Sequence, residues 1–318
     1  MNAYLIGIAA GLAAAALIAG PATGGLLALP LPMLAGLPVM LVALGWGTRA
    51  ALVAAVVAGL VDLAIGGPAS ALAFLAVVVL PAVFYSHLLG LARAPDGVTR
   101  FDGRLEWYPL SRVLVAIAWI SGFAVVGAFA FSNFSPAEFT DRLMTVFDDD
   151  LRDFAAQNDV DEGRMREMFR SYVELFPLMA GIGVMASNTF NLWAAAAITR
   201  LSGRSERPKD DFAAATTVPK SFLAAFFVAA VVAAGDGEIA FLARGLAGAL
   251  AAFIGIAGYG VVHVMTRGNR GRTLLLTGLY LATFTLFVLP FALMIALGAA
   301  DAIFGIRRRL LSAGGGRP

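Results

Sequence analysis

Four polar residues interrupt an apolar run that is otherwise long enough to cross a membrane. Between Phe176 and Thr199 the chain carries no charge, and a helix of this length, rising about 1.5 Å per residue, spans a hydrocarbon layer about 30 Å thick. The polar residues in its middle are Ser187, Asn188, Thr189 and Asn191. Amide and hydroxyl groups of this kind can hold a solute or an ion, or they can bond to neighbouring helices.

Asn188 and Asn191 are three positions apart and therefore project from nearly the same helical face. An amide that faced lipid would have no hydrogen-bond partner, which is costly. We therefore expect both side chains to face other helices or a wet cavity. Hydrogen bonds between helices, worth about 0.6 to 2 kcal/mol each, are the simpler interpretation, and a binding site for a solute or an ion is the alternative.

Asp62 and Arg244 are ionisable residues within apolar sequence. Charged groups at membrane depth are costly unless they are paired. Both are predicted to lie towards the outer face, so we expect an ion pair between them; a role in proton or substrate binding and separate contact with water are the alternatives. Together with Ser187, Asn188 and Asn191 they form the set of candidate substrate-binding residues.

The residues that most enzymes need are scarce. The chain has no cysteine and two histidines, His87 and His263, which excludes disulfides, thiol nucleophiles and cysteine-bound metals. No zinc-protease, nucleophile-elbow or phosphate-loop motif occurs. We therefore expect no enzymatic activity, no metal and no cofactor, and we interpret both histidines as structural residues near the inner ends of their spans.

The composition indicates a membrane protein. Of the 318 residues, 60% are hydrophobic and 14% are charged, and the mean hydropathy is +0.83, whereas about 25% of a soluble domain is charged. The net charge of +2 does not indicate nucleic-acid binding, because the basic residues are spread over short loops. Nine apolar runs occur, at residues 4 to 20, 24 to 45, 50 to 66, 69 to 91, 112 to 131, 174 to 199, 219 to 234, 239 to 265 and 273 to 305.

These runs predict an all-α fold, a polytopic transmembrane helix bundle of about 8 to 10 spans in a single membrane domain. The second run contains Pro30, Pro32 and Pro38, and each proline removes a backbone donor and clashes with the preceding turn. We expect a broken helix there. Carbonyl groups freed at membrane depth can mark a transport site, although a kinked helix that only packs is the simpler interpretation.

Loop charges predict the orientation. Most of the 23 basic residues lie at 93 to 112, 199 to 220, 266 to 273 and in a basic tail at 307 to 318, which the positive-inside rule places in the cytoplasm. The acidic loop is expected outside. The last run is then predicted to cross twice, in two tilted legs of about seventeen residues that meet near Pro290.

The acidic loop at residues 132 to 172 has helical patterning of its own. Ser135 followed by Pro136 and Glu138 is a capping-box start, and a second helix start is predicted at Asp159. Apolar residues recur every three or four positions between them, which predicts an amphipathic helix on the membrane surface or over the bundle. The acidic run at residues 148 to 150 is interpreted as a solvated face, with cation binding as the alternative.

Small residues follow a helical spacing in two runs. Such spacing lets helices approach closely, either within the chain or against a partner protein. Packing within the chain is the simpler interpretation. The residues are Gly245, Gly248, Ala252, Gly255 and Gly258 in the eighth run, and the pairs Ala9 with Ala13 and Ala10 with Ala14 in the first.

Several short motifs occur in a fixed order along the chain. They are LEWYPLSR at 105 to 112, Asn191-Leu192-Trp193 followed by Arg200, Ser202-Gly203-Arg204 and Arg207-Pro208, His263 with Thr266-Arg267-Gly268, and Ala300-Asp301-Ala302 with Arg307-Arg308-Arg309. This order resembles the YybS-like family, a domain-of-unknown-function family of bacterial polytopic membrane proteins. The resemblance implies an integral protein of the cytoplasmic (inner) membrane without an established activity and carries over no catalytic residue. A more distant likeness, in helical architecture alone, is to the substrate-binding subunits of energy-coupling-factor vitamin transporters and to rod-shape membrane proteins.

Two hypotheses follow for the function. The first is a solute-binding or transport-type protein in which Asn188, Asn191 and the proline-broken second run line a cavity open to the outer face. The second is a structural membrane protein that recruits or organises envelope proteins. The expected partners are the lipid bilayer and either a small-molecule ligand or a membrane-protein partner, and the expected location is the bacterial inner membrane.

Overall fold

The chain folds almost entirely into helices, as the apolar runs predict. The computed structural model describes residues 2–20, 30–94, 105–130, 135–158 and 160–314. One short antiparallel hairpin, β1 (Ala92–Arg93) with β2 (Glu106–Trp107), accompanies the helices. The helices are α1 (Ala3–Ala19), η3 (Leu31–Leu34), α2 (Leu37–Trp46), α3 (Thr48–Phe74), η4 (Leu75–Val79), α4 (Leu80–Gly90), α5 (Leu110–Ala130), α6 (Pro136–Asn158), α7 (Glu162–Glu174), α8 (Phe176–Leu201), α9 (Phe212–Ala215), α10 (Lys220–Ala233), α11 (Gly237–Met265), α12 (Arg272–Leu286), α13 (Val288–Phe304) and α14 (Ile306–Gly314).

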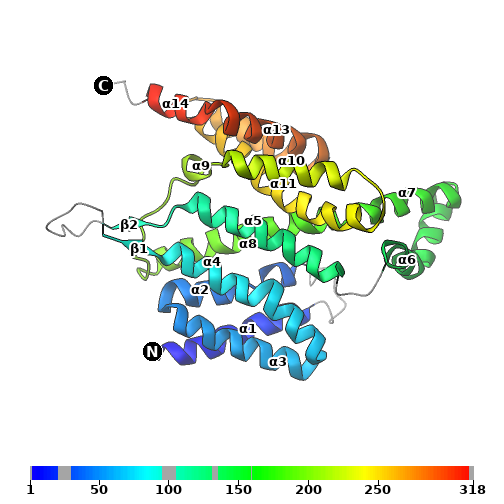
Figure 1. Ribbon diagram of the computed structural model, residues 1–318, viewed down its shortest axis with the longest axis horizontal. Helices are drawn as coiled ribbons and strands as arrows, with labels where there is room; N and C mark the ends of the chain where they lie inside the picture. The colour runs from blue at the N-terminus through cyan, green and yellow to red at the C-terminus, as the bar shows by residue number, and fades with distance from the viewer. Residues whose placement is uncertain (1, 21–29, 95–104, 131–134, 159, 315–318) are drawn as a thin grey trace.

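Helix α11 is the centre of the bundle. It packs against α8, α13, α5 and α10, and Figure 1 shows α10, α11 and α13 above α5 and α8, with α1, α2 and α3 below. A Cβ atom at Gly248 would lie 2.1 Å from the Leu178 carbonyl of α8, and one at Gly258 would lie 1.9 Å from the Met294 carbonyl of α13. The small residues of α11 therefore allow helices of the same chain to touch on two sides, as predicted.

The first span uses only one of its two predicted small-residue rows. Ala10 and Ala14 are buried, whereas Ala9 and Ala13 are exposed. The buried row faces α3, because a Cβ atom at Gly11 would lie 2.5 Å from the Ala54 carbonyl. Periodicity alone cannot choose between two rows that are offset by one residue, so the packing partner decides.

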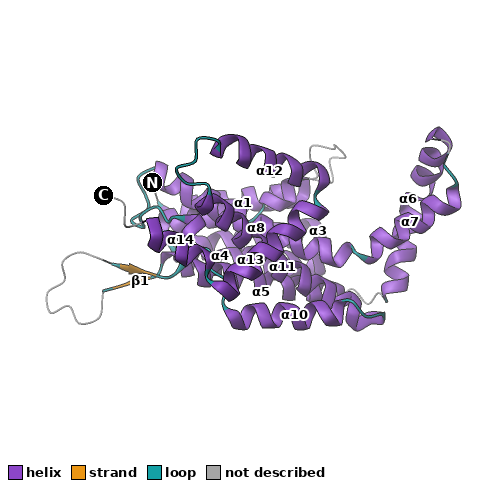
Figure 2. Ribbon diagram, turned by 90° about the horizontal axis from the view of Figure 1, so that it is seen from above, coloured by secondary structure: helices purple, strands orange, loops and turns teal. Residues whose placement is uncertain are grey.

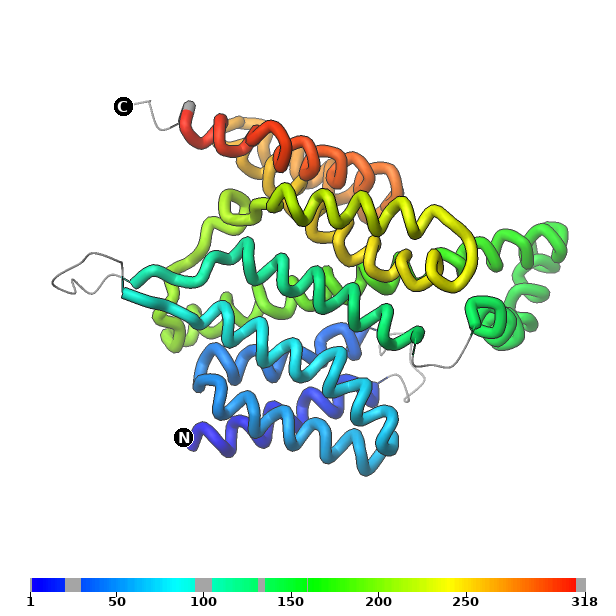
Figure 3. The backbone as a smooth tube through the Cα atoms, viewed as in Figure 1, coloured from blue at the N-terminus to red at the C-terminus, as the bar shows by residue number. Residues whose placement is uncertain are grey.

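A glycine divides the longest helical stretch into two legs. Gly67 has φ +80° and ψ −178° and precedes Pro68, a backbone conformation that glycine adopts at little cost. The chain turns back at this point, and the legs lie side by side (Figure 3); a Cβ atom at Gly59 of the first leg would lie 2.9 Å from the Leu75 side chain of the second. This break agrees with the predicted boundary between the third and fourth apolar runs.

The proline-rich second run is broken, as expected. Residues 21–29 lie outside the described part of the chain. From there a turn at Pro30 leads into the short 3-10 helix η3, and α2 begins afresh with Pro38 in its first turn. The carbonyl of Met33 in η3 is thereby left for a partner outside its own helix.

The predicted count of about 8 to 10 spans is not supported by helix length and composition. In the described part of the chain, three helical stretches are long and apolar enough to cross a membrane, or up to five if two bent pairs each count as one. Glycine and proline breaks shorten the remaining apolar helices to 10–17 residues, below the usual length of about 20 residues for a span. The three long stretches are Thr48–Gly90, Leu110–Ala130 and Gly237–Met265.

Basic and acidic segments gather at opposite ends of the bundle. The start of α1, the hairpin, α9 and α14 lie at one end, and α6 and α7 project from the other (Figures 1 and 2).

Helices α12 and α13 meet at Phe287, whose φ is +34°, so the last apolar run forms two legs, as predicted. The basic tail is corrected, because residues 306–314 form α14 and Arg307 in it is buried.

The acidic loop forms two helices that pack on each other. The predicted capping box is present, with Ser135 and Glu138 each accepting from the other's backbone N–H at 3.2 Å. The second helix is capped by Asp161, which accepts from the Arg164 N–H at 2.8 Å; the predicted start at Asp159 lies outside the described residues. Phe139 and Phe176, with ring centroids 5.6 Å apart, join α6 to the bundle.

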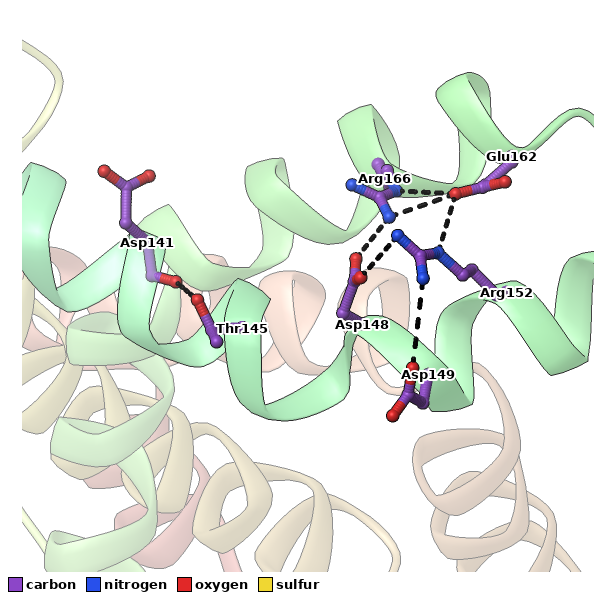
Figure 4. A network of polar contacts seen from close by, with 7 residues as sticks. All are labelled: Asp141, Thr145, Asp148, Asp149, Arg152, Glu162 and Arg166. Carbon is purple, nitrogen blue, oxygen red and sulfur yellow. Dashed lines mark hydrogen bonds and ion pairs between the residues drawn. The ribbon is translucent and has the colours of Figure 1, made fainter.

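The acidic run contributes to an ion-pair network between α6 and α7 (Figure 4). Asp148 pairs with Arg152 at 2.9 Å and with Arg166 of α7. Glu162 bonds to the same two arginines, at 3.3 Å and 3.0 Å. Asp148 and Glu162 therefore hold two helices together, whereas Asp149, whose side chain is 98% exposed, and the exposed Asp150 match the solvated face that the sequence predicts.

Candidate functional site

Asn188 is paired inside the bundle. Its amide nitrogen donates to the Ser121 hydroxyl of α5 at 3.2 Å, and both side chains are buried. This bond joins α8 to α5 and matches the simpler interpretation of the polar patch. Neither Asn188 nor Asn191 lines any of the five pockets of the described residues.

Asn191 and Ser187 bond to the broken second run. The Asn191 amide donates to the Met33 carbonyl at 2.8 Å, and the Ser187 hydroxyl donates to the same oxygen. The sequence predicted that both asparagines and the proline-broken run would line one cavity. The structure places Asn191 in contact with that run, whereas Asn188 bonds to α5. The contact satisfies a carbonyl that the broken helix cannot, which is the condition for irregular backbone at membrane depth.

Three buried polar atoms in this region have no hydrogen-bond partner among the described residues. They are the side-chain amide oxygen of Asn191 (Oδ1) and the hydroxyls of Tyr85 and Ser86. The Tyr85 hydroxyl lies near Ser121 but outside hydrogen-bond geometry. Unpaired buried polar atoms are uncommon in native proteins, so each of the three is a place where a ligand or a water molecule can bind.

The predicted ion pair between Asp62 and Arg244 is wrong. Asp62 is 8% exposed and accepts from the Ser70 hydroxyl at 2.8 Å across the Gly67 break. The Arg244 guanidinium donates to the carbonyls of Ala233, Glu174 and Gly235, at 3.0 to 3.3 Å. Each charged group makes its hydrogen bonds to a nearer partner: Asp62 to a hydroxyl beyond the helix break, and Arg244 to free carbonyls at helix ends. Whether Asp62, Arg244 or the polar residues of α8 bind a substrate stays a prediction.

Two buried arginines, which the sequence marked only as parts of family-like motifs, hold the basic end of the bundle together. Arg207 donates to both Asp210 carboxylate oxygens at 2.8 and 2.9 Å and to the carbonyls of Leu89 and Tyr108. It therefore ties the segment after α8 to the end of α4 and the start of α5. The feature of the sequence that indicates this ion pair is the spacing of Arg207 and Asp210, which are three residues apart.

Arg307 is the second of these arginines and is 2% exposed. Its guanidinium bonds to the Asp301 carboxylate at 2.7 Å and to the Ala213 carbonyl of α9 at 2.6 Å. The backbone N–H of Arg307 donates to the other Asp301 oxygen at 2.6 Å. The pair fixes α14 against α9 and α13. In the sequence, Asp301 is visible as a charged residue within an apolar run.

Both histidines make local contacts near the basic end, as expected. A ring nitrogen of His87 lies 3.1 Å from the Thr48 hydroxyl, and one of His263 lies 2.8 Å from the Tyr280 hydroxyl of α12. Tyr259 and Tyr280 stack with ring centroids 5.5 Å apart. In the described part of the chain, no group of three or more His, Asp or Glu side chains could hold a metal ion.

An apolar groove runs along one face of α8. Its volume is about 520 Å³, and its walls come from α8, α9, α11 and α12. Phe190 and Trp193, each 52% exposed, leave it open along the side of the bundle. The wall on the far side is formed by Tyr259, His263 and Tyr280.

A second pocket, of about 390 Å³, continues the groove towards the basic end. The two share Thr189, Trp193 and Phe212, so they adjoin each other, and we call the two together the α8 groove. Thr189 is therefore the member of the predicted polar patch that reaches a cavity. Arg200 and Lys209 line the basic end of this groove.

The basic end of the α8 groove carries a net positive charge. Asp210 is paired with Arg207 and Asp211 with Arg267, and the Arg267 guanidinium lowers the pKa of Asp211 below its ordinary value. The half-buried guanidinium of Arg200 and the exposed ammonium of Lys209 make no hydrogen bond or ion pair with any described residue. Two cations are thus left for an anionic group in the groove.

No protein-family model, curated protein or solved structure matches the chain.

Proposed function

We propose that the protein is a membrane protein of solute-binding or transport type whose ligand occupies the α8 groove. The observation that supports this is an apolar pocket that adjoins a second pocket lined by two cations without acidic partners among the described residues. Pockets of about 300 to 1,000 Å³ with mostly apolar walls and a few polar groups are typical of small-molecule sites. The proposal is for ligand binding without catalysis.

The shape and charge of the α8 groove favour an amphipathic ligand with an anionic end. Aromatic and aliphatic walls would bury the apolar part, with Phe190, Trp193 and Tyr280 in contact with it. The anionic end would lie beside Arg200 and Lys209. Arginine favours carboxylate and phosphate because its planar guanidinium can donate two hydrogen bonds at once.

We further propose ten crossings of the bacterial inner membrane, with the basic end of the bundle in the cytoplasm. This count is argued from the reversals at Gly67 and Phe287 and treats each shorter apolar helix as one crossing, whereas helix length and composition alone give three to five spans in the described part of the chain. Helices of 14 to 17 residues can cross where the bilayer thins locally. The gathering of basic segments at one end supports the orientation, and the resemblance to the YybS-like family agrees with it.

A filled groove tests the proposal. Ala186 is exposed and lines the α8 groove, so Ala186→Phe adds a ring there without displacing core residues. A thermal-shift screen of the detergent-purified protein against vitamins, lipids and metabolites should reveal ligands that raise the unfolding temperature, since a ligand that binds only the native state stabilises it by mass action. We expect Ala186→Phe to lose that response.

Ala13→Phe is the matched control, because Ala13 is also an exposed helical alanine and lies in α1, away from the groove. It should respond to the ligand as the parent protein does. A ligand response that survives in Ala186→Phe, or no response to any anionic amphiphile, would count against the α8 groove as the site.

The alternative is a structural protein that recruits or organises envelope proteins. The pairing of Asn188 and Asn191 within the bundle favours it, and so do exposed apolar side chains on the projecting helices, such as Val146, Phe154 and Tyr172. This alternative predicts an unchanged thermal-shift screen and a stable membrane-protein partner that is lost in Val146→Asp.

A further inference from the structure

A third pocket lies on the other side of Arg200, at the basic end of the bundle. Its volume is about 340 Å³, and it is formed where the ends of α2, α4 and α8 meet the start of α3 and the hairpin. It shares Arg200 and Asp210 with the α8 groove. Ser86, Arg204 and Trp107 line this pocket and do not line the groove.

The charges around this pocket favour an anion. Its lining holds Arg200, Arg204 and Arg207 against the carboxylates of Glu206 and Asp210. Both oxygens of Asp210 are already bonded to Arg207. One positive charge is therefore in excess among the lining residues.

The Arg204 side chain is held in place at the pocket. Its guanidinium carbon lies 4.2 Å from the centroid of the Trp46 ring, a cation–π contact that leaves the edge N–H groups free to donate. Arg200 makes no hydrogen bond or ion pair with any described residue. Two guanidinium groups are thus available to donate to an oxyanion.

Neutral hydroxyls complete the arrangement. Ser86 is 1% exposed, and its hydroxyl has no hydrogen-bond partner among the described residues. Thr48, which lies 3.1 Å from a ring nitrogen of His87, lines the same pocket. A buried hydroxyl without a partner is destabilising, and an anionic oxygen is the kind of acceptor that would satisfy it.

We propose that this pocket binds a phosphate-type oxyanion, with Ser86, Arg200 and Arg204 as donors. The pocket adjoins the α8 groove and shares Arg200 with it, whereas Ser86 and Arg204 line this pocket and not the groove. The proposal does not rest on the function proposed for the groove. Its basic-end position makes two sources of the phosphate accessible, a soluble phosphate compound and the headgroup of an anionic lipid. The recognition chemistry is the same for both.

Titration of the detergent-purified full chain with sodium phosphate tests the proposal. At an ionic strength held constant with sodium chloride, phosphate should raise the unfolding temperature and saturate. Ser86→Ala and Arg204→Gln should each weaken the apparent phosphate affinity by about tenfold or more, the usual cost of one lost charge-assisted hydrogen bond. Ser86→Ala removes no hydrogen bond to a described residue, so it should fold as the parent does.

Arg309→Gln is the control, because Arg309 is exposed at the same end and lines none of the pockets. It should keep the parent affinity. Phosphate also stabilises proteins without binding, by exclusion from their surface, but that effect does not saturate and would be the same in all variants. Equal phosphate responses in the parent, Ser86→Ala and Arg204→Gln would overturn the proposal.

Nanodiscs distinguish the two sources. If a lipid headgroup is the ligand, discs with phosphatidylglycerol should stabilise the protein more than discs of phosphatidylcholine, and Ser86→Ala should lose that difference. If a soluble phosphate is the ligand, sodium phosphate should stabilise the parent equally in both kinds of disc. No response to either, with Ala186→Phe still altering ligand binding in the α8 groove, would refute this site alone.

Discussion

Among single side chains, the buried arginines have the clearest structural role. Arg207 and Arg307 each combine one carboxylate with backbone carbonyls from other helices. A buried charge is tolerated only when its hydrogen bonds are met, and each guanidinium has enough donors to join several chain segments. These contacts hold the loop that carries Lys209 and α9 against the basic end, where both candidate pockets lie.

Loss of the Arg307 side chain should destabilise the protein strongly. Arg307→Ala would leave the Asp301 carboxylate buried without its cation, at a cost of about 3 to 5 kcal/mol. Thermal or denaturant unfolding of the detergent-purified protein measures it. Arg309→Ala is the control, because Arg309 is exposed on the same helix, and equal stability of the two variants would show that the buried pair contributes little.

The asparagines of α8 show how far residue type alone can predict. The burial of both followed from the cost of exposing amides to lipid, and Asn191 alone contacts the proline-broken run. The partners did not follow, because Ser121 and the Met33 carbonyl are 67 and 158 positions away in the chain. The amides proved to be bonded within the bundle, and Thr189 between them reaches the cavity.

Among helices, α11 organises the packing. Its glycines lie where backbone carbonyls of α8 and α13 approach most closely, so a side chain at those positions has no room. Helix α12, by contrast, has no buried residue and is joined to α11 by the contacts of Tyr280 and Thr283. The α8 groove is open because α12 stands apart from the core in this way.

A bulky residue at Gly258 should force α11 and α13 apart. In Gly258→Leu the new Cβ would lie 1.9 Å from the Met294 carbonyl, and overpacking of this kind costs about 1 to 3 kcal/mol or more. Gly278→Leu on α12 is the matched control, because no atom lies within 4 Å of a Cβ there. A melting temperature for Gly258→Leu no lower than that of Gly278→Leu would contradict the packing.

At the scale of the whole molecule, charge and helix direction together support the proposed orientation. Basic segments lie at one end of the bundle, with α6 and α7 at the other (Figure 1). The chain has no cysteine, so single cysteines can report the side of the membrane without a background signal. Both candidate pockets depend on this orientation, because it sets whether their ligands come from the cytoplasm.

Cysteine labelling should place the two ends on opposite sides. In intact cells, a membrane-impermeant maleimide is expected to label Asp149→Cys in α6 and to leave Ser202→Cys and Ser312→Cys unlabelled until the membrane is permeabilised. All three positions are exposed. Labelling of Ser312→Cys in intact cells would require an odd number of crossings or the reverse orientation.

The predictions from sequence that proved correct depend on local effects. Composition fixed the all-helical apolar class, prolines and glycines fixed where helices break, and small-residue spacing marked the close contacts of α11, because each effect acts within a few neighbouring residues. Partner choice was decided only by tertiary structure. Asp62 and Arg244 each bond to nearer groups. Arg307, predicted to lie in a tail, is buried in the core, and Arg200 lines two pockets. These outcomes depend on which distant segments the packed helices bring together.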